Sequence, residues 1–276
     1  MKISAVVLTK DEEKNIERCL KSLSFCNEII VIDDYSTDKT IEKVQSSKFK
    51  LQIKSKIQIF GKKLNKDFAA QRNFGMSRAS NEWILFVDAD EVVSKELAKE
   101  IVKLLNGYIV KENAYYIRRR DFFWGKELKY GELRRIRQMG LIRLLRKDSG
   151  KWLGNVHEEF KVKSQKSKVK SLNSFLNHYP HQTLKEFIQD VNYYSSLRAK
   201  KLYNQGKSVN ILEIIIWPLG KFISNFLINL GFLDGAAGFA YAFLMSFHSF
   251  LVRAKLYMKK LDTVPLSGRH LRFFNR

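Results

Sequence analysis

The chain has 276 residues, of which 45% are hydrophobic and 13% aromatic, which is ample for a packed core and excludes intrinsic disorder as the main state. Its two cysteines, Cys19 and Cys26, cannot form a disulfide framework, and three prolines exclude a linker-rich architecture. The apolar run after Met1 is shorter than the core of a secretory signal, so we expect a reduced protein that faces the cytosol.

The net charge of +22 is distributed very unevenly along the chain. Residues 1–110 carry 19 Lys or Arg and 16 Asp or Glu, whereas residues 111–276 carry 31 and 12. The back half therefore produces a strong positive field. Such a field favours anionic partners, namely nucleic acid, an anionic membrane surface or a phosphorylated glycolipid.

The first third alternates short apolar runs with segments of helical periodicity, and this order predicts a parallel sheet in an α/β fold. The expected strands cover residues 3–8, 28–32, 51–60 and 83–87. The expected helices cover residues 12–23, a short segment opened by 36–38, then 68–79 and 94–105.

Beyond residue 114 arginines are interleaved with aromatic residues, so we expect a boundary near 107–114. A helix is expected over 183–205, followed by strongly apolar helices over 211–261. Residues 235–252 form an uncharged run of 18, near the lower limit for a membrane span, but glycines interrupt it. Three placements stay open: helices in or re-entering the membrane interface, which flanking basic residues favour, a true span, or a buried soluble pair.

Two acidic clusters follow predicted strands, Asp33-Asp34 and Asp88-Ala89-Asp90. Ligands bind at the carboxyl ends of the strands in an open α/β sheet, so both clusters face a potential site. A hard divalent ion that bridges diphosphate oxygens would compensate such carboxylates. The pattern indicates Mg²⁺ or Mn²⁺ with a nucleoside diphosphate, although solvated strand ends and helix caps carry the same triplet.

Four segments occur in the order of a known family: residues 6–13 (VVLTKDEE), 30–38 (IVIDDYSTD), 70–75 (AQRNFG) and 84–90 (ILFVDAD). Together they resemble the family 2 inverting glycosyltransferases of GT-A fold. Further matches are similar to the subgroup of lipopolysaccharide core β-glucosyltransferases; they are Trp152, residues 155–159 (NVHEE), His178-Tyr179 and residues 231–235 (GFLDG). The resemblance covers roughly residues 1–260.

The resemblance implies a Rossmann-like, mostly parallel sheet flanked by helices, and the apolar C-terminal helices are expected to associate with a membrane. Together with the change in composition, it suggests a nucleotide-sugar-binding half (1–110), an acceptor-binding and catalytic half (111–205) and the membrane-associating region (206–276). In such enzymes the positions of Thr9 and Asp34 contact uridine.

Further roles follow from the same resemblance. Glu12 and Asp33 are expected near the uridine. Arg72 approaches the nucleotide, although a helix-surface arginine is the plain alternative. Asp88 contacts the ribose or sugar, and Asp90 ligates Mn²⁺ or Mg²⁺, which stabilises the leaving UDP.

An inverting transfer needs a base that takes the proton of the acceptor hydroxyl. Glu158 matches the family position for this base, whereas Glu159, next along an extended segment, is expected to point away. His157 is the competing base or a group that orients the diphosphate. An ordinary surface His-Glu pair is the alternative.

The sequence departs from the family at two places. Asp11 stands where Asn is usual, which alters a turn hydrogen bond. The acceptor-side segment 125–139 diverges and is rich in arginine, which suits a phosphorylated saccharide through guanidinium forks and aromatic stacking, or forms a solvated face.

These observations predict a metal-dependent transferase that moves a hexose, most simply glucose, from a UDP-sugar. The acceptor is a lipopolysaccharide-core or other lipid-linked saccharide at the cytoplasmic face of the inner membrane, where the protein is peripheral or monotopic. Three alternatives remain: a polyprenyl-phosphate glycosyltransferase of the same fold, a basic protein that binds nucleic acid or lipid without catalysis, and a membrane scaffold that keeps the fold but is catalytically silent. No helix-turn-helix or zinc-finger signature supports nucleic-acid binding.

Overall fold

The computed structural model describes residues 1–46, 55–107, 110, 112–154, 158–163, 169–181 and 183–262. The chain forms two compact units, and each unit combines two separate segments of the sequence. Unit 1 consists of Met1–Asp121 and Arg135–Tyr179, and unit 2 of Phe122–Arg134 and Pro180–Arg276. The division into donor, acceptor and membrane regions remains a prediction, because compactness does not report on ligand contacts.

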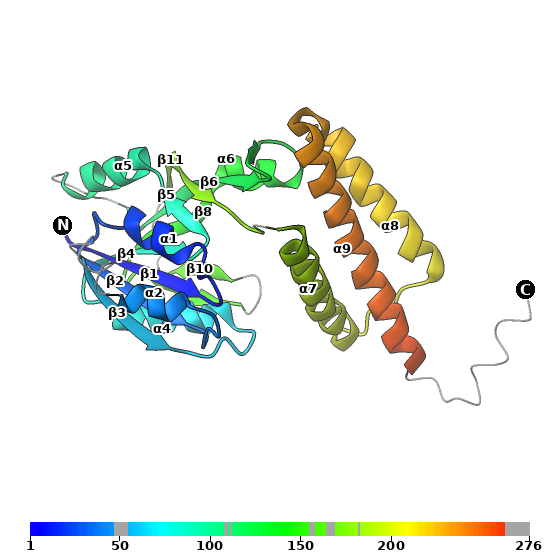
Figure 1. Ribbon diagram of the computed structural model, residues 1–276, viewed down its shortest axis with the longest axis horizontal. Coiled ribbons are helices and arrows are strands. Elements are labelled where there is room, and N and C mark those ends of the chain that lie inside the picture. Colours follow the sequence, from blue (N-terminus) through cyan, green and yellow to red (C-terminus); the bar gives the residue numbers. More distant parts are fainter. Residues whose placement is uncertain are drawn as a thin grey trace, which may run out of the picture. The chain divides into compact units, whose positions relative to one another are not determined.

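Unit 1 is built on a mixed sheet with the strand order β3-β2-β1-β4-β8-β6-β11-β5, with β7 paired to β6 (Figure 1). The strands are β1 (Ile3–Thr9), β2 (Glu28–Asp33), β3 (Lys56–Gly61), β4 (Trp83–Asp88), β5 (Glu91–Val93), β6 (Ala114–Phe123), β7 (Lys126–Leu128), β8 (Leu141–Arg146) and β11 (Lys170–His178). Strands β3, β2, β1 and β4 are parallel, as predicted. Strand β8 runs antiparallel between β4 and β6, and β9 (Gly150–Leu153) pairs with β10 (Glu159–Val162) in a separate hairpin.

Helices cover both faces of this sheet because its central strands are apolar on both sides. One face packs on α1 (Ile16–Ser22), α2 (Thr40–Gln45) and α5 (Lys95–Leu105) through residues such as Val7 and Val31. The opposite face packs on α4 (Phe68–Arg78) and the β9–β10 hairpin through residues such as Val6 and Phe86. This arrangement confirms the predicted GT-A architecture.

Local capping explains where two of these helices begin. Ser94 caps α5 as predicted, since its hydroxyl accepts from the amide of Leu97 at 3.1 Å. Helix α2 begins later than the capping residues suggest, at Thr40. The Asp38 side chain accepts from the amides of Thr40 and Glu13 at 2.9 and 3.0 Å, and so fixes the turn before the helix.

The described part of unit 2 contains three long helices, α7 (Leu184–Asn204), α8 (Ile211–Ile223) and α9 (Gly235–Asp262). The helix over 183–205 is therefore confirmed. A π-helical turn (Ser224–Ile228) and a 3-10 turn (Gly231–Asp234) join α8 to α9. By length and composition, Ile211–Ile228 and Gly231–Leu261 could each cross a membrane.

Candidate functional site

The predicted donor residues lie at adjacent strand ends in unit 1. Strands β1 and β2 are in register so that Thr9 pairs with Asp33, and β1 and β4 so that Leu8 pairs with Asp88. The amide of Asp34 also donates to the Thr9 carbonyl at 3.0 Å. The parallel topology therefore brings the two acidic clusters to one edge, where open α/β sheets bind ligands.

Several of these acidic side chains bind nearby backbone or side-chain groups. Asp33 accepts from the hydroxyl of Ser36 at 2.6 Å, and Asp34 accepts from the amide of Leu64 at 2.8 Å. Glu12 accepts from the side-chain amide of Asn15 at 2.7 Å. These bonds fix the loops after β1, β2 and β3. The carboxylates therefore have a structural role at this edge of the sheet, independent of any ligand.

The Thr9 hydroxyl is buried and has no hydrogen-bond partner among the described residues. Buried polar atoms are nearly always paired in native proteins, so an unpaired one indicates an absent water or ligand. Such an atom suits a ligand contact, and the role of Thr9 at the nucleotide stays a prediction.

Asp11 explains one departure from the family pattern. Its φ of 51° lies in the left-handed region, which Asn and Asp tolerate better than other residues with a Cβ. Its carboxylate accepts from the amide and the hydroxyl of Thr37 at 2.6 and 3.1 Å. An aspartate thus supplies the same local acceptor that an asparagine would.

The AQRNFG segment lies on α4, and its polar residues make specific contacts. Gln71 donates to the carbonyl of Lys62 at 2.6 Å. Asn73 forms two bonds with the backbone of Trp152, donating to its carbonyl at 2.9 Å and accepting from its amide at 3.0 Å. Asn73 therefore fixes β9 beside α4.

Gly75 sets how closely α4 approaches the sheet. A Cβ at this position would lie 2.4 Å from Cγ1 of Val6 and 3.2 Å from Cγ1 of Ile32. Only glycine permits this approach without a shift of the helix. The close contact brings Arg72, on the same helix, to the end of β4.

Asp88 is the centre of a buried ion-pair network. Its Oδ1 lies 3.0 Å from Nη2 of Arg72, and its Oδ2 lies 2.7 Å from Nη2 of Arg143. The same Arg143 nitrogen is 3.0 Å from Oε1 of Glu91, and Nε of Arg72 is 2.9 Å from Oε1 of Glu158. Among the predicted residues, Arg72 therefore contacts both Asp88 and Glu158 directly.

The electrostatics of this network favour an ionised Asp88. Burial alone would raise the pKa of Asp88, but the guanidinium groups of Arg143 and Arg72 outweigh it and hold this pKa well below its usual range. Burial raises the pKa of Glu91 despite the contact with Arg143. Asp88 is thus ionised at the end of β4, whereas the neighbouring Glu91 is less acidic than an ordinary glutamate.

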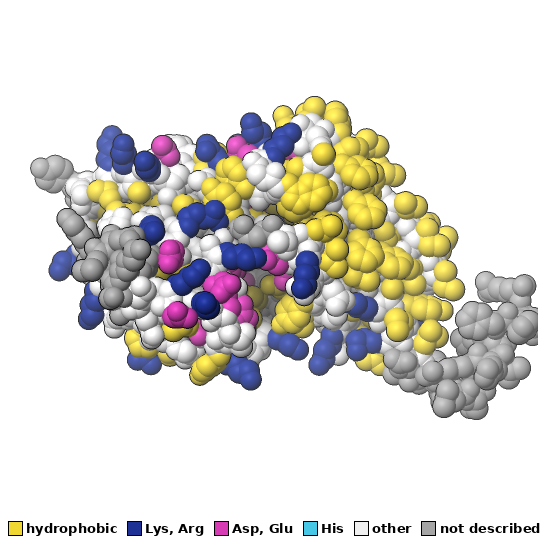
Figure 2. Space-filling model, viewed as in Figure 1, with side chains coloured by type: hydrophobic (Ala, Val, Ile, Leu, Met, Phe, Trp, Pro, Cys, Tyr) yellow, Lys and Arg dark blue, Asp and Glu magenta, His cyan; other side chains and the backbone are white. Residues whose placement is uncertain are grey.

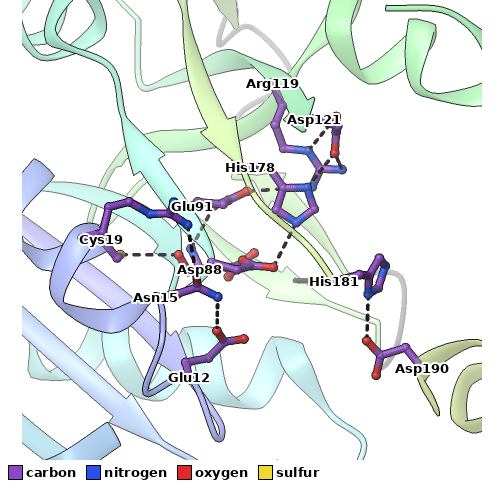
Figure 3. Close-up of polar contacts among 12 residues, drawn as sticks. Glu12, Asn15, Cys19, Asp88, Glu91, Arg119, Asp121, His178, His181 and Asp190 are labelled. Atoms are coloured by element: carbon purple, nitrogen blue, oxygen red, sulfur yellow. Dashed lines mark hydrogen bonds and ion pairs between the residues drawn. The ribbon is translucent and has the colours of Figure 1, made fainter. Parts of the chain in front are cut away.

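Asp90 is linked through His178 to a second chain of polar contacts. In Figure 3 the imidazole of His178 lies beside the side chains of Asp121 and Arg119. Nε2 of His178 lies 3.1 Å from Oδ2 of Asp90, and Nδ1 lies 2.6 Å from Oδ1 of Asp121. Arg119 contacts the same Asp121 oxygen at 2.9 Å. Burial would lower the pKa of His178, but the Asp90 and Asp121 carboxylates raise it to about 9.

Glu158 and Glu159 differ as expected for neighbours in an extended segment. Glu158 is mostly buried against Arg72, whereas Glu159 is exposed on β10. His157 lies outside the described residues. The catalytic roles of Glu158 and His157 remain predictions.

A divalent cation fits this site only if a ligand shares it. Among the residues described, no three His, Cys, Asp or Glu side chains are grouped so that they could hold an ion. Asp88 directs its oxygens at two arginines, whereas Asp90 faces the imidazole of His178. The donor set therefore suits a hard cation bound between Asp90 and the oxygens of a diphosphate.

Five residues of the site were given no chemical role from the sequence, although His178 carried part of the family resemblance: Glu91, Arg119, Asp121, Arg143 and His178. A signal existed for Arg143, because it interrupts the apolar run Leu-Ile-Arg-Leu-Leu in β8. Similarly, Arg119 and Asp121 share one side of β6 at a spacing of two. Charged residues inside apolar strands are rarely buried without a partner.

Comparisons with known proteins identify the family of the chain. The family Glycosyl transferase family 2 matches residues 4–158. A protein of Rickettsia bellii (strain RML369-C), named as an uncharacterized glycosyltransferase, is 28% identical over 280 residues, which cover 96% of this chain and 89% of the relative. The lipopolysaccharide core biosynthesis glycosyltransferase LpsC of Rhizobium meliloti (strain 1021) is 28% identical over 263 residues, or 93% and 92% of the two chains.

Solved structures are more distant. The mannosyltransferase PcManGT from Pyrobaculum calidifontis, in complex with GDP-Man and Mn²⁺, matches with a TM-score of 0.48 at 14% identity, covering 95% of this chain and 79% of that chain. TarS of S. aureus in complex with UDP matches with a TM-score of 0.48 at 16% identity, covering 96% and 93%.

Proposed function

The chain belongs to glycosyl transferase family 2, and from this membership we propose that it transfers a hexose, most simply glucose, from a UDP-sugar to a lipopolysaccharide-core or other lipid-linked saccharide. The observation that carries the proposal is the network around Asp88. It joins Arg72, Glu158 and Arg143 at the strand edge where the family match and the acidic clusters coincide.

The donor is assigned to the ends of β1, β2 and β4. Thr9 and Asp34 contact the uridine, with Glu12 and Asp33 beside it. The unpaired hydroxyl of Thr9 supports this assignment, because it offers a donor and an acceptor in a buried position.

Arg72 and Asp88 serve the nucleotide and the sugar. Arg72 already holds Asp88 and Glu158, and its Nη1 is buried without a hydrogen-bond partner in the described chain. Asp90 would hold Mn²⁺ or Mg²⁺ together with diphosphate oxygens. The bound cation supplies positive charge that stabilises the leaving diphosphate.

Glu158 acts as the base of an inverting displacement. It takes the proton of the acceptor hydroxyl as that oxygen attacks the anomeric carbon and the bond to UDP breaks on the opposite face. The hydrogen bond from Nε of Arg72, at 2.9 Å, fixes the position of the Glu158 carboxylate. His157 is the alternative for the base or for orienting the diphosphate.

The acceptor is assigned from charge and from the relatives. LpsC is named for lipopolysaccharide core biosynthesis, which supports a phosphorylated saccharide acceptor. The guanidinium of Arg120 lies 4.1 Å from the ring centre of Phe175, and that of Arg137 lies 5.2 Å from it, so cations and an aromatic ring are combined within unit 1. The reaction is placed at the cytoplasmic face of the inner membrane, where lipid-linked acceptors are available.

Calorimetric titration with UDP and GDP, each with and without Mn²⁺, tests the donor site. We expect UDP-selective binding that Mn²⁺ strengthens and that Asp90→Ala loses while the variant keeps its fold. Labelled UDP-hexoses are then screened against membrane lipids. Well-folded protein that binds neither nucleotide, with or without metal, would overturn the proposal.

A further inference from the structure

Helix α8 and the turns after it expose a continuous apolar surface in unit 2, seen as the yellow area in Figure 2. We call it the α8 face, and it is defined by Leu212, Ile216, Leu219, Ile223, Ile228 and Phe232. These side chains are between 45% and 71% exposed. The first four recur at helical spacing, so they form one stripe. Soluble monomers rarely expose an apolar surface of this extent.

We propose that the α8 face lies in the interface of an anionic phospholipid bilayer, with α8 parallel to the membrane plane and the chain attached to one leaflet without crossing it. The proposal deepens the proposed function, because it specifies how an enzyme with a lipid-linked acceptor is held at the membrane. It rests on contacts within unit 2 and does not depend on the identity of the sugar.

A membrane-spanning α9 is incompatible with its packing on α7. The rings of Phe187 and Tyr241 are 5.8 Å apart near the start of both helices. Farther along, Nζ of Lys255 donates to the hydroxyl of Ser195 at 2.8 Å. Helix α7 therefore accompanies α9 along most of its length, and any span made by α9 would take α7 into the bilayer.

Helix α7 is not suited to the hydrocarbon region. Its outer side exposes charged residues, including Lys185, Arg198, Lys200 and Lys201. Lys and Arg side chains are strongly disfavoured at the centre of a bilayer. The α7 side of unit 2 consequently stays in water, and the opposite side, which carries the α8 face, meets the lipid.

The turn between α8 and α9 is also unsuited to the bilayer centre. The carboxylate of Asp234 accepts from the backbone amides of Lys129 and Tyr130, each at 2.9 Å. Lys221 forms an ion pair with Glu132 at the same end of α8. A hairpin that entered the membrane by its tip would bury this polar segment, so the structure favours an in-plane position over a re-entrant one.

Basic residues at the other end of the helices point to anionic lipid. Lys207 is exposed just before α8, and Lys260 is exposed in the last turn of α9. The guanidinium of Arg253 lies 4.9 Å from the ring centre of Trp217, which is half exposed on α8. Trp and Arg together are typical of the headgroup boundary, and Lys and Arg beside an apolar face favour anionic lipids.

Vesicle binding by the full chain tests the face and the lipid. The chain is sedimented with phosphatidylcholine vesicles and with vesicles that also contain phosphatidylglycerol, in the absence of any sugar nucleotide. We expect stronger binding to the anionic vesicles, reduced more than about tenfold in the double variant Ile216→Glu/Leu219→Glu. Val102→Glu, at an exposed apolar position of α5, is the matched control and is expected to bind as the unmodified chain does.

Trp217 provides a depth measurement. Brominated lipids should quench part of the fluorescence, and Trp217→Phe should remove that quenched part. Unchanged vesicle binding by the double variant would overturn the proposal. A lipid-free dimer, seen by light scattering and dissociated by the same variant without loss of vesicle binding, would assign the α8 face to a second copy of the chain instead.

Cysteine labelling distinguishes in-plane attachment from a span. The native Cys19 and Cys26 are buried, so single cysteines can be introduced at exposed positions near the two ends of the α8–α9 pair, as Lys126→Cys beside Gly235 at the start of α9 and Lys207→Cys just before α8. An impermeant maleimide should label both from the same side of oriented membrane vesicles. Labelling from opposite sides would overturn the proposal. Vesicle binding without UDP binding would leave this inference standing while the proposed function failed.

Discussion

Arg143 donates to Asp88, with its Nη2 2.7 Å from Oδ2, and the same nitrogen lies 3.0 Å from Oε1 of Glu91. Both Arg143 and Glu91 are almost completely buried, whereas the side chain of Asp88 is 31% exposed. One arginine therefore compensates two carboxylates and holds the more accessible one at the strand end, where it meets Arg72.

Removal of this arginine should destabilise unit 1. Arg143→Leu leaves Glu91 buried without its strongest counter-charge, and breaking a buried ion pair costs about 3–5 kcal/mol. We expect a decrease of that order in the free energy of unfolding measured in urea. The double variant Arg143→Leu/Glu91→Leu should recover part of the loss, because it leaves no unpaired charge at Glu91. If Arg143→Leu were as stable as the unmodified chain, the ion pairs of Arg143 would not contribute to the stability of unit 1.

Gly75→Ala tests the close approach of α4 to the sheet. The new Cβ would lie 2.4 Å from Cγ1 of Val6, so we expect overpacking to cost about 1–3 kcal/mol. Gly220→Ala is the matched control, since nothing lies within 4 Å of its Cβ position on α8. That substitution should raise stability by about 0.5–1 kcal/mol through helix propensity. Equal changes in the free energy of unfolding at both positions would show that the contact with Val6 does not require a glycine at position 75.

Glu28 predicts a pH-dependent contribution to stability. It accepts from the hydroxyls of Ser4 and Ser80 at 2.6 and 2.7 Å and from the side-chain amide of Gln58 at 2.8 Å. Burial alone would raise the pKa of Glu28, but the hydrogen bonds from Ser4 and Ser80 outweigh it and lower this pKa. The ionised form therefore stabilises the fold above the usual glutamate pKa, and this stabilisation is lost as the pH falls through the lowered value.

Glu28→Gln should accordingly be less stable than the unmodified chain by about 1–3 kcal/mol at pH 7. The difference should shrink below about pH 4, where the unfolded carboxyl is protonated. Urea unfolding of both proteins from pH 3 to pH 7 measures it. A difference that is constant across this range would mean that ionisation of Glu28 does not contribute.

Glu158→Gln distinguishes the two acceptor classes. With a saccharide hydroxyl as acceptor, loss of the base should reduce kcat by about 10²–10⁴-fold, with little change in the affinity for UDP. A polyprenyl phosphate is already ionised, so most activity would remain with that acceptor. Glu159→Gln, exposed on β10, is the matched control and should keep its activity. Full activity of Glu158→Gln with a saccharide acceptor would show that Glu158 is not the catalytic base.

The strands and helices of the first third were predictable because each is a local pattern of apolar residues. The location of Asp88 and Asp90 beside the other acidic cluster was also predictable, because the carboxyl ends of parallel strands lie at one edge of the sheet. The insertion of β8 between β4 and β6 was not predicted, because strand order depends on pairings between distant segments. For the same reason the sequence could not identify Arg143, among 50 basic residues, as the partner of Asp88.

His178 illustrates the same limit. Its place in the His-Tyr pair was recognised, but its contacts with Asp90 and Asp121 join β11 to the end of β4 and to β6. These residues are separated by 88 and 57 positions in the chain. Residue type and spacing carry no information about such a contact, which arises only once the strands have paired.

Each unit is made of two segments that are separated in the sequence, and this constrains the order in which the protein can fold during synthesis. Phe123, Leu128 and Leu133 are synthesised early, yet they pack with Phe187, Val191, Ala237 and Leu244, which emerge much later. Domains generally fold from the N-terminus during synthesis. The apolar side chains of residues 122–134 therefore remain exposed to solvent until their later partners have been synthesised. A chain truncated after Tyr179 would keep this segment without those partners, so we expect it to require a chaperone or to aggregate.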